Sequence, residues 1–303
     1  MTMAKCLELI QISKNHQEFD QHGSFAFPCE LYYTVIDGKK RDRIPGHWHD
    51  ELEIGYVDSG RVLLETASEN LEIREGQCYF INSHIVHGMR FLKERGSFYS
   101  FVFHENMIKG PEAINQNAVY PILESSRRVF TSDDDRLNVT FKKLINVFEG
   151  NQSGYELSVR HELEAFWLRL LELFPVEASS ERVIGERIGR MLGFIEKHFA
   201  DNIGIIDIAK SADISKRECY RCFKERLGET PGNYLMRYRV TQAAKRIVLT
   251  SDHFEVIAKE CGFASASYFS TRFKKVYGLS PGEYRKQERQ KEESSCLIDT
   301  ASA

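Results

Sequence analysis

The chain has 303 residues, of which 42% are hydrophobic and 28% are charged, and its net charge is −3. This composition is ordinary for a globular protein, and the length is sufficient for two domains. A chain of this length and composition is neither too small nor too polar to bury a hydrophobic core. The charge is uneven. Residues 183–290 carry 20 Lys and Arg against 13 Asp and Glu, whereas residues 1–182 carry 20 against 28. A basic C-terminal part on an acidic remainder is typical of a nucleic-acid-binding module joined to a domain with another task.

The N-terminus lacks the basic start and long apolar run of a signal peptide, and no apolar run reaches the length of a membrane span. The seven cysteines form an odd set without the spacing of a disulfide framework. We therefore expect reduced thiols and a cytoplasmic protein. Cys219 and Cys222 match a C-x-x-C pattern inside an amphipathic helix, so we interpret them as two core thiols, with a redox or metal role as the alternative.

From Leu31 to about Phe103 apolar and polar residues alternate with the period of a β-strand. Turn-forming residues separate the alternating stretches. Short strands are predicted at 31–36, 52–57, 62–64, 78–81 and 98–103. Many short strands with close turns indicate an antiparallel sandwich or barrel over residues 1–130.

Two stretches of this region resemble the motifs of the cupin family. HWHDELE begins at His47 and is followed by Gly60, and GQCYFIN begins at Gly76 and leads to His87. If one strand carries positions 47, 49 and 53, their side chains share a face, and a neighbouring strand brings His87 to it. The chain departs from the family pattern in three places: Arg41 replaces a glycine, and Asn82 and His84 stand where proline and glycine are usual.

We expect this region to form an effector pocket lined by His47, His49, Glu53 and His87. One interpretation is a pocket for an organic effector such as a sugar or small metabolite, without a required cofactor. The alternative is a site for divalent iron, manganese, zinc or nickel held by the same four residues. A metal-dependent cupin enzyme with an attached DNA-binding module is the rival function, but no second acid-base constellation accompanies the four residues.

The period becomes helical between Asp133 and Phe174, with a break at 150–154. We predict an antiparallel helical pair over 131–174 that either dimerises the protein or caps the β-domain. A short polar linker is expected at 175–186. A flexible tail is expected at 288–303.

The segment from Ile206 to Tyr284 contains an internal sequence repeat with two copies. Phe223-Lys224, Gly228 and Pro231-Gly232 recur fifty residues later as Phe273-Lys274, Gly278 and Pro281-Gly282. Each copy predicts a short helix, a turn and a second helix with a polar, basic outer face, which is the helix-turn-helix pattern. In the first copy Ser215 and Glu218 have the spacing of a capping box.

A helix is predicted between the copies, from Gly232 to Leu249. At 1.5 Å per residue it would be roughly 26 Å long. With the widths of the units it joins, it could place two recognition helices about 34 Å apart, which is one turn of DNA.

Residues 187–287 resemble the DNA-binding domain of the AraC/XylS family of bacterial transcription regulators. The stretch from Ile257 to Arg285 carries that family's signature, and the helix-turn-helix motifs are expected at about 206–227 and 254–277. The resemblance implies that five residues reach base edges: Arg217, Tyr220, Arg221, Ser267 and Thr271. Five others are expected to contact phosphates: Lys216, Lys224, Arg272, Lys274 and Lys275.

The sequence thus predicts an α+β protein with two domains. A cupin-like barrel or sandwich and its helical pair precede an all-α domain with two helix-turn-helix motifs on a connecting helix. The expected function is that of a non-enzymatic transcription regulator, an activator by family resemblance, that binds promoter DNA and a small effector. The same resemblance implies a homodimer and contact with RNA polymerase.

Overall fold

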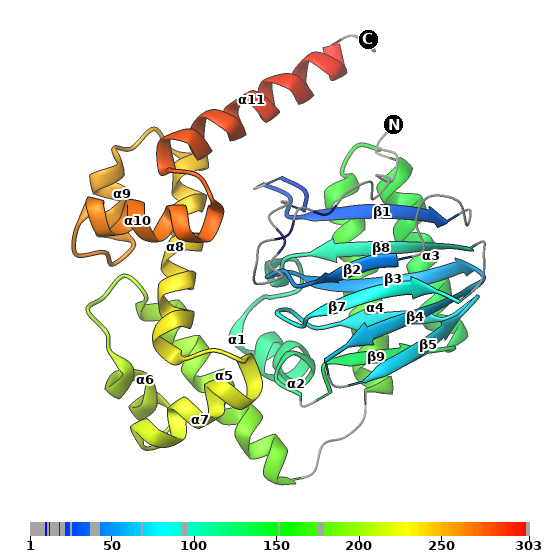
Figure 1. The fold of residues 1–303 in the computed structure, drawn as a ribbon, viewed down its shortest axis with the longest axis horizontal. Helices are drawn as coiled ribbons and strands as arrows, with labels where there is room; N and C mark the ends of the chain where they lie inside the picture. Colours follow the sequence, from blue (N-terminus) through cyan, green and yellow to red (C-terminus); the bar gives the residue numbers. More distant parts are fainter. Residues whose placement is uncertain are drawn as a thin grey trace. The chain divides into compact units, whose positions relative to one another are not determined.

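The computed structural model describes residues 10, 12, 18, 22–24, 26–36, 43–67, 69–92, 96–125, 127–150, 152–174 and 179–300. The chain forms two compact units, Met1–Glu186 and Arg187–Ala303, and Figure 1 shows the sheets of the first and the helices of the second. Within the described part of the chain, no helix has both the length and the apolar character needed to cross a membrane.

Two antiparallel sheets form the N-terminal unit, with strand orders β1-β8-β3-β6-β9 and β2-β7-β4-β5. The strands are β1 (Cys29–Ile36), β2 (Arg43–His47), β3 (Leu52–Ser59), β4 (Arg61–Thr66), β5 (Asn70–Arg74), β6 (Cys78–Ile81), β7 (His87–Phe91), β8 (Gly96–Phe103) and β9 (Val129–Ser132). The predicted antiparallel β-domain is confirmed. Alternation did not reveal β2, β5, β7 and β9. In β2 the sequence RIPGH contains proline and glycine, which are rare inside strands.

Apolar side chains from both sheets meet between them. Val57 and Phe98 of the five-stranded sheet pack with Val62 and Met89 of the four-stranded sheet in one buried cluster. On β4, Val62 and Leu64 are buried while their neighbours are half-buried, as the alternation of a strand requires. The inner faces of the sheets therefore form the core beside which the pocket lies.

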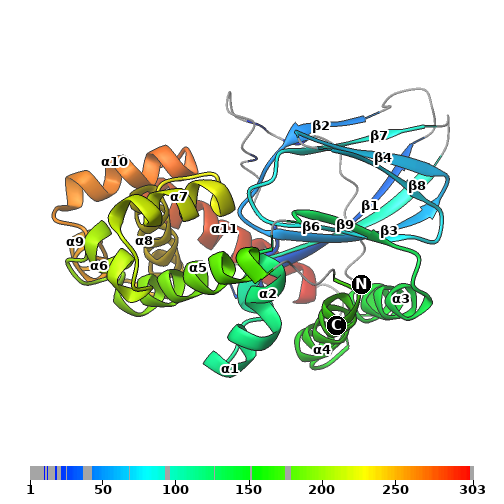
Figure 2. The same ribbon diagram turned by 90° about the horizontal axis from the view of Figure 1, so that it is seen from below.

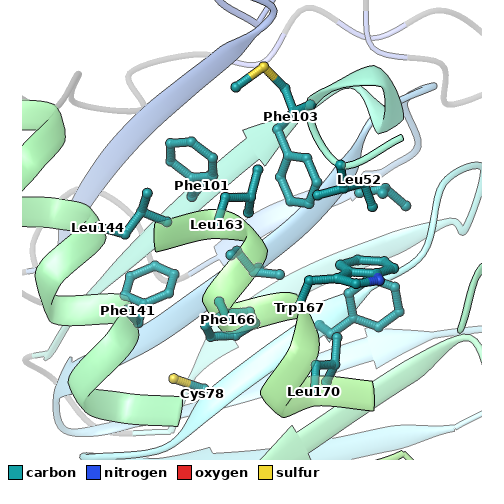
Figure 3. Close-up of a cluster of buried hydrophobic side chains, with 14 of the residues drawn as sticks. Leu52, Cys78, Phe101, Phe103, Phe141, Leu144, Leu163, Phe166, Trp167 and Leu170 are labelled. Carbon is teal, nitrogen blue, oxygen red and sulfur yellow. The ribbon is translucent and has the colours of Figure 1, made fainter. Parts of the chain in front are cut away.

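The outer face of the five-stranded sheet is covered by α3 (Asp135–Gly150) and α4 (Tyr155–Leu173). Figure 2 shows both helices on that side of the sheet, and Figure 3 shows side chains of both helices packing against β8, with Trp167 of α4 beside Phe103. The predicted helical pair is confirmed, and one of its two proposed roles, capping the β-domain, is observed. The connection from β8 to β9 contains η1 (Glu105–Met107), α1 (Glu112–Ile114), η2 (Asn115–Val119) and α2 (Tyr120–Leu123).

The C-terminal unit is helical, as predicted. Its elements are α5 (Ser179–His198), α6 (Ile205–Ser211), α7 (Lys216–Leu227), α8 (Pro231–Leu249), α9 (Phe254–Glu260), α10 (Ala266–Tyr277) and α11 (Pro281–Thr300). The pairs α6–α7 and α9–α10 are the two helix-turn-helix motifs, and α8 contacts both of them. The predicted connecting helix, α8, therefore packs against both motifs.

The two copies share backbone geometry as well as sequence. The second helix of each copy ends at a glycine with positive φ, Gly228 at 69° and Gly278 at 72°. A proline then opens the next helix, where its missing N–H is not needed. The matching glycine and proline positions are therefore matching helix ends.

Two expected boundaries were wrong. Helix α5 begins at Ser179, inside the predicted linker 175–186, and α11 continues to Thr300 through the predicted tail. Both segments are rich in Glu, Arg, Lys and Gln, which favour helix even when no apolar stripe is present. Residues 301–303 of the tail lie outside the described part.

Candidate functional site

The outer face of α7 carries the candidates for DNA contact in the first motif. All five side chains are exposed: Lys216, Arg217, Tyr220, Arg221 and Lys224. The helix begins at Ser215, whose hydroxyl accepts a hydrogen bond from the amide of Glu218 at 3.2 Å. The inward face is formed by Cys219, Cys222 and Phe223, which are fully buried. Both cysteines are free thiols.

The second half of the predicted capping box was wrong. The carboxylate of Glu218 accepts hydrogen bonds from Arg221 at 2.5 Å and from Arg187 at 3.2 Å. Arg221 also pairs with Glu225 at 3.1 Å. Charged guanidinium donors bind a carboxylate more strongly than a neutral amide does, which explains the change of partner. Arg221 is therefore held between two acidic side chains on the helix surface.

On α10 four of the five candidates are exposed: Ser267, Thr271, Lys274 and Lys275. Arg272 is half-buried and lies on Tyr268, with its Nε donating to the tyrosine hydroxyl at 3.0 Å. The hydroxyl of Thr271 donates to the carbonyl of Ser267 at 3.0 Å. In this state the Thr271 hydroxyl keeps only its acceptor capacity for a base.

A cavity lies between the sheets of the N-terminal unit. It contains all four residues that the cupin-like motifs predict, together with polar and apolar neighbours. The lining residues are Ile10, Glu18, His22, Tyr32, Ile44, His47, His49, Glu53, His87, Met89, Ser100 and Val102. The predicted set is thus brought together in one place.

His47, His49 and Glu53 do not share one strand, and that expectation was wrong. His47 ends β2 of the four-stranded sheet, Glu53 belongs to β3 of the five-stranded sheet, and His49 lies in the connection between them. His87 pairs directly with His47 in the register of β2 and β7. Side chains from both sheets surround a cavity more completely than one strand face could, because a strand face presents its side chains from one side only.

The three histidines are oriented by backbone carbonyls. Nδ1 of His47 hydrogen-bonds to Pro45 O at 2.9 Å, Nδ1 of His49 to Glu51 O at 3.1 Å and Nδ1 of His87 to Ile85 O at 2.8 Å. Because a carbonyl only accepts hydrogen bonds, each Nδ1 carries the proton. The neutral form of each ring then has its lone pair on Nε2.

Glu53 is held from behind by two hydroxyl groups. Its Oε1 accepts from Tyr79 at 2.8 Å and from Ser100 at 2.7 Å. The Tyr79 ring occupies the space above Gly55, where an added Cβ would lie 2.0 Å from the ring. The other oxygen, Oε2, lies 3.3 Å from Nε2 of His87 and 3.5 Å from Nε2 of His49.

Two further pocket residues, Glu18 and His22, come from the chain before β1. Both are buried. The amide of Glu18 donates to the carbonyl of Trp48 at 2.9 Å, and its Oε2 lies 3.5 Å from Nε2 of both His22 and His47. Nδ1 of His22 hydrogen-bonds to the hydroxyl of Tyr32 at 2.9 Å. Sequence reasoning missed this pair because no motif or strand period surrounds it.

The pocket shifts the pKa values of its groups in opposite directions. Burial lowers the pKa of His47 to about 4, with a contribution from the nearby His87 ring. Burial also opposes the charged form of His22, but the Glu18 carboxylate outweighs it and raises the pKa of His22 to about 9. For Glu53, the close approach of the His49 and His87 rings to its carboxylate outweighs burial, and its pKa lies well below the usual range.

His84 departs from the cupin pattern in residue type but keeps the left-handed backbone conformation that glycine would adopt at this position. His84 replaces the usual glycine and has a φ of 62°, in the left-handed region that glycine favours. Its amide donates to the carbonyl of His49 at 2.9 Å, and its ring pairs with Asp50 at 2.8 Å. These bonds hold the connection that carries His49 while the chain keeps a strained residue there.

Comparison with known proteins assigns both units. A family model described as a helix-turn-helix domain matches residues 208–287, and one described as an AraC-like ligand binding domain matches residues 33–171. The chain is 30% identical to the HTH-type transcriptional activator RhaS of Escherichia fergusonii, over 87% of this chain and 96% of that protein. It is 28% identical to the uncharacterized HTH-type transcriptional regulator YdeC of Bacillus subtilis, over 91% of this chain and 97% of that protein. Among solved structures, ToxT of Vibrio cholerae is similar with a TM-score of 0.47 and 14% identity, over 85% of this chain and 96% of that chain.

Proposed function

Because this chain belongs to the AraC family of HTH-type transcription regulators, we propose that its two motifs read promoter DNA and that the histidine pocket controls this binding. The chain is a DNA-binding transcription regulator that senses a small molecule. The proposal adds which residues perform each task.

For DNA recognition we assign α7 and α10 to successive major grooves. The supporting observation is that nine of the ten candidate side chains lie exposed on these two helices, while the opposite faces are buried. Arg217, Tyr220 and Arg221 are the base-reading candidates of α7, and Ser267 and Thr271 are those of α10. The lysines and Arg272 are assigned to phosphates, where they would supply affinity without sequence information.

For effector sensing we assign the pocket formed by His47, His49, Glu53 and His87. Polar groups from both sheets converge on a buried cavity, which is the usual construction of a small-molecule site. No catalytic role is proposed for these residues, because the relatives are transcription regulators. A divalent metal is the second candidate occupant, favoured by the three Nδ1 hydrogen bonds that direct Nε2 inward.

The regulator is proposed to act as a homodimeric activator that contacts RNA polymerase. The name of the Escherichia fergusonii relative supports activation. For dimerisation, α3 and α4 present exposed apolar side chains at Val139, Leu157 and Leu168, which are 53%, 74% and 57% exposed. These helices cap the sheet with one face, so their other face is available for a second copy.

Selection of bound fragments from a random DNA pool by the full-length protein tests the DNA assignment. We expect one enriched site with two half-sites about one helical turn apart, 10–10.5 base pairs. Enrichment of a single short half-site would contradict reading by both motifs. Equal retention of all sequences would contradict base recognition altogether.

A further inference from the structure

Five side chains in the pocket direct nitrogen or oxygen atoms at one another, and they come from three parts of the chain. Two separate triads each bring one ligand atom per residue to within 4.8 Å of the others: His47, His49 and His87, and Glu18, His22 and His49. Every member is buried. His49 belongs to both triads, so the chain before β1 and the β-domain share one centre.

Several of these atoms lack a hydrogen-bond partner within the described ranges. They are Nε2 of His22, His49 and His87 and Oε2 of Glu18. A buried polar atom without a partner is costly and is rare in native proteins. For His49, His87 and Glu18 the cost is removed if a cation occupies the space between these atoms, because their lone pairs, which repel one another, all bind the cation.

The distances fit a coordination sphere better than a set of hydrogen bonds. The separations between Nε2 and carboxylate oxygens are 3.3 Å for His87 with Glu53, 3.5 Å for His49 with Glu53 and 3.5 Å for His47 with Glu18. Hydrogen bonds of this kind are normally about 2.7–3.2 Å long. Two ligands bound at about 2.1 Å to one tetrahedral zinc ion lie about 3.4 Å apart.

The size and charge of the site also favour an ion. The cavity volume is about 20 Å³, whereas roughly 10–15 Å³ already suffices for one water. An ion fits there, but a sugar would need the pocket to open. Glu18 and Glu53 place two carboxylates in this buried space, and His22 is the protonated imidazole that lies beside Glu18. The remaining negative charge would be offset by a bound cation.

We propose that the pocket binds one divalent transition-metal ion of the zinc, iron, manganese or nickel type, and that Glu18 closes the site over it. The inference rests on the proposed sensing role of this pocket and names its ligand class. The ligands are His47, His49, His87, Glu53 and Glu18. His22 is a positioning residue, because it connects Glu18 to the hydroxyl of Tyr32 in β1.

A site closed in this way differs from a catalytic one. Catalytic metal sites keep a position open for substrate, whereas structural sites fill their coordination sphere with protein ligands. Closure by Glu18 would make the position of Glu18, and its backbone hydrogen bond to Trp48, depend on the ion. Metal availability would then be converted into a change in the N-terminal unit.

The test uses the full-length protein purified without a metal-affinity tag and stripped with a chelator. Cobalt(II), whose visible absorption reports its ligands, is titrated into the wild-type protein, Glu18→Gln, His22→Gln and His49→Ala. Affinities for zinc are measured by competition with a chromogenic chelator. The matched control is Glu156→Gln, which removes an exposed carboxylate of the same unit.

We expect about one ion per wild-type chain, about ten-fold or more weaker binding in Glu18→Gln, a smaller loss in His22→Gln and none in Glu156→Gln. Hydrogen exchange at the Glu18 amide, which bonds to Trp48, should slow when the ion binds. No ion in the wild-type protein would overturn the metal site, and equal affinity in Glu18→Gln would overturn closure. Neither result would contradict the proposed role in DNA recognition, which is tested separately by the selection of bound DNA fragments.

Discussion

In three of the four pocket histidines, one ring nitrogen is held by the backbone and the other faces the cavity. Nδ1 of His47, His49 and His87 is bound to a carbonyl two residues away in the chain, and this fixes both the ring plane and the tautomer. Replacement by glutamine or asparagine would preserve polarity but not this geometry. The chemistry of the pocket therefore resides in the local backbone as much as in the residue types.

On the DNA-binding surface, Arg221 already forms ion pairs with Glu218 and Glu225, whereas Arg217 is assigned no such pair. Arg217→Ala should cost about 1–3 kcal/mol at one base pair and relax the preference there. Arg221→Ala should cost less, because its guanidinium must first leave Glu218 and Glu225. Binding of both variants to single-base variants of the selected site gives the comparison. A uniform loss over all sequences in Arg217→Ala would make Arg217 a phosphate contact.

Lys274 of α10 is assigned to a phosphate, so its effect should depend on salt and not on sequence. Lys274→Ala should reduce the slope of log affinity against log salt by about one. Lys259→Ala on α9 is the matched control, since it removes an exposed lysine with no assigned DNA contact. An unchanged slope in Lys274→Ala would remove this residue from the phosphate set.

At the residue scale, sequence identified the four motif residues of the pocket but not Glu18 and His22. Spacing such as H-x-H-x-x-x-E is recognisable because it repeats a local pattern. The sequence around Glu18 and His22 has no pattern of its own, and their contacts with His47 and Tyr32 join residues that are not neighbours in the chain. No local rule predicts such contacts.

At the scale of elements, the turn inside each helix-turn-helix motif requires a left-handed residue. Gly262 has a φ of 77°, and a Cβ there would lie 2.6 Å from the carbonyl oxygen of Phe199. Gly262→Ala should therefore destabilise the C-terminal unit by roughly 1–3 kcal/mol. Asp213 occupies the matching turn with a φ of 55°, so Asp213→Gly should be neutral or stabilising. Chemical denaturation measures both, and an equal loss in the two variants would contradict this reading of the turns.

An ion pair links the start of α3 to α4: Asp134, the residue before α3, pairs with Arg169 of α4. Asp134 accepts from the amide of Leu137 at 2.9 Å, and hydrogen bonds from Arg169 lower its pKa to about 2. Because the pKa is lowered on folding, its stabilisation is complete above the ordinary value of 3.8 and is lost as pH falls towards 2. Asp134→Ala should cost about 0.5–2 kcal/mol at neutral pH.

The unfolding free energy of Asp134→Ala should converge with that of the wild-type protein as pH falls through about 2. Asp135→Ala is the control, because Asp135 is exposed one position later. A constant difference at all pH values would show that the charge of Asp134 does not stabilise the helix pair.

Long periodic elements were predictable, and only some of the short strands were. The helices α3, α4, α7, α8 and α10 carry clear 3.6-residue stripes or caps, and their positions were predicted within a few residues. The strands β2, β5, β7 and β9 have four or five residues each. The equally short β6 is an uninterrupted apolar run, whereas these four contain polar residues, glycine or proline that obscure the strand pattern. Their pairing partners define them, and pairing is a property of the sheet.

At the scale of the whole molecule, the regulator consists of a sensor unit and a DNA-binding unit. Sequence predicted this division from charge, from the duplicated motif and from the cupin-like motifs. It could not predict where α5 begins, because residues 175–186 contain both turn-forming and helix-forming residues. Coupling between the units requires two states that differ in free energy, and a ligand shifts them only by its difference in affinity for the two.

The most direct test of a pocket that controls DNA binding is the affinity of the full-length protein for its selected DNA site. It should be measured by fluorescence anisotropy with metal-free and zinc-loaded protein, in the wild type and in His49→Ala. We predict a change of at least five-fold on loading the wild-type protein, the lower end of typical allosteric coupling, and no change in His49→Ala. Equal affinities in all four samples, with zinc binding to the wild type verified, would contradict control of DNA binding by this pocket.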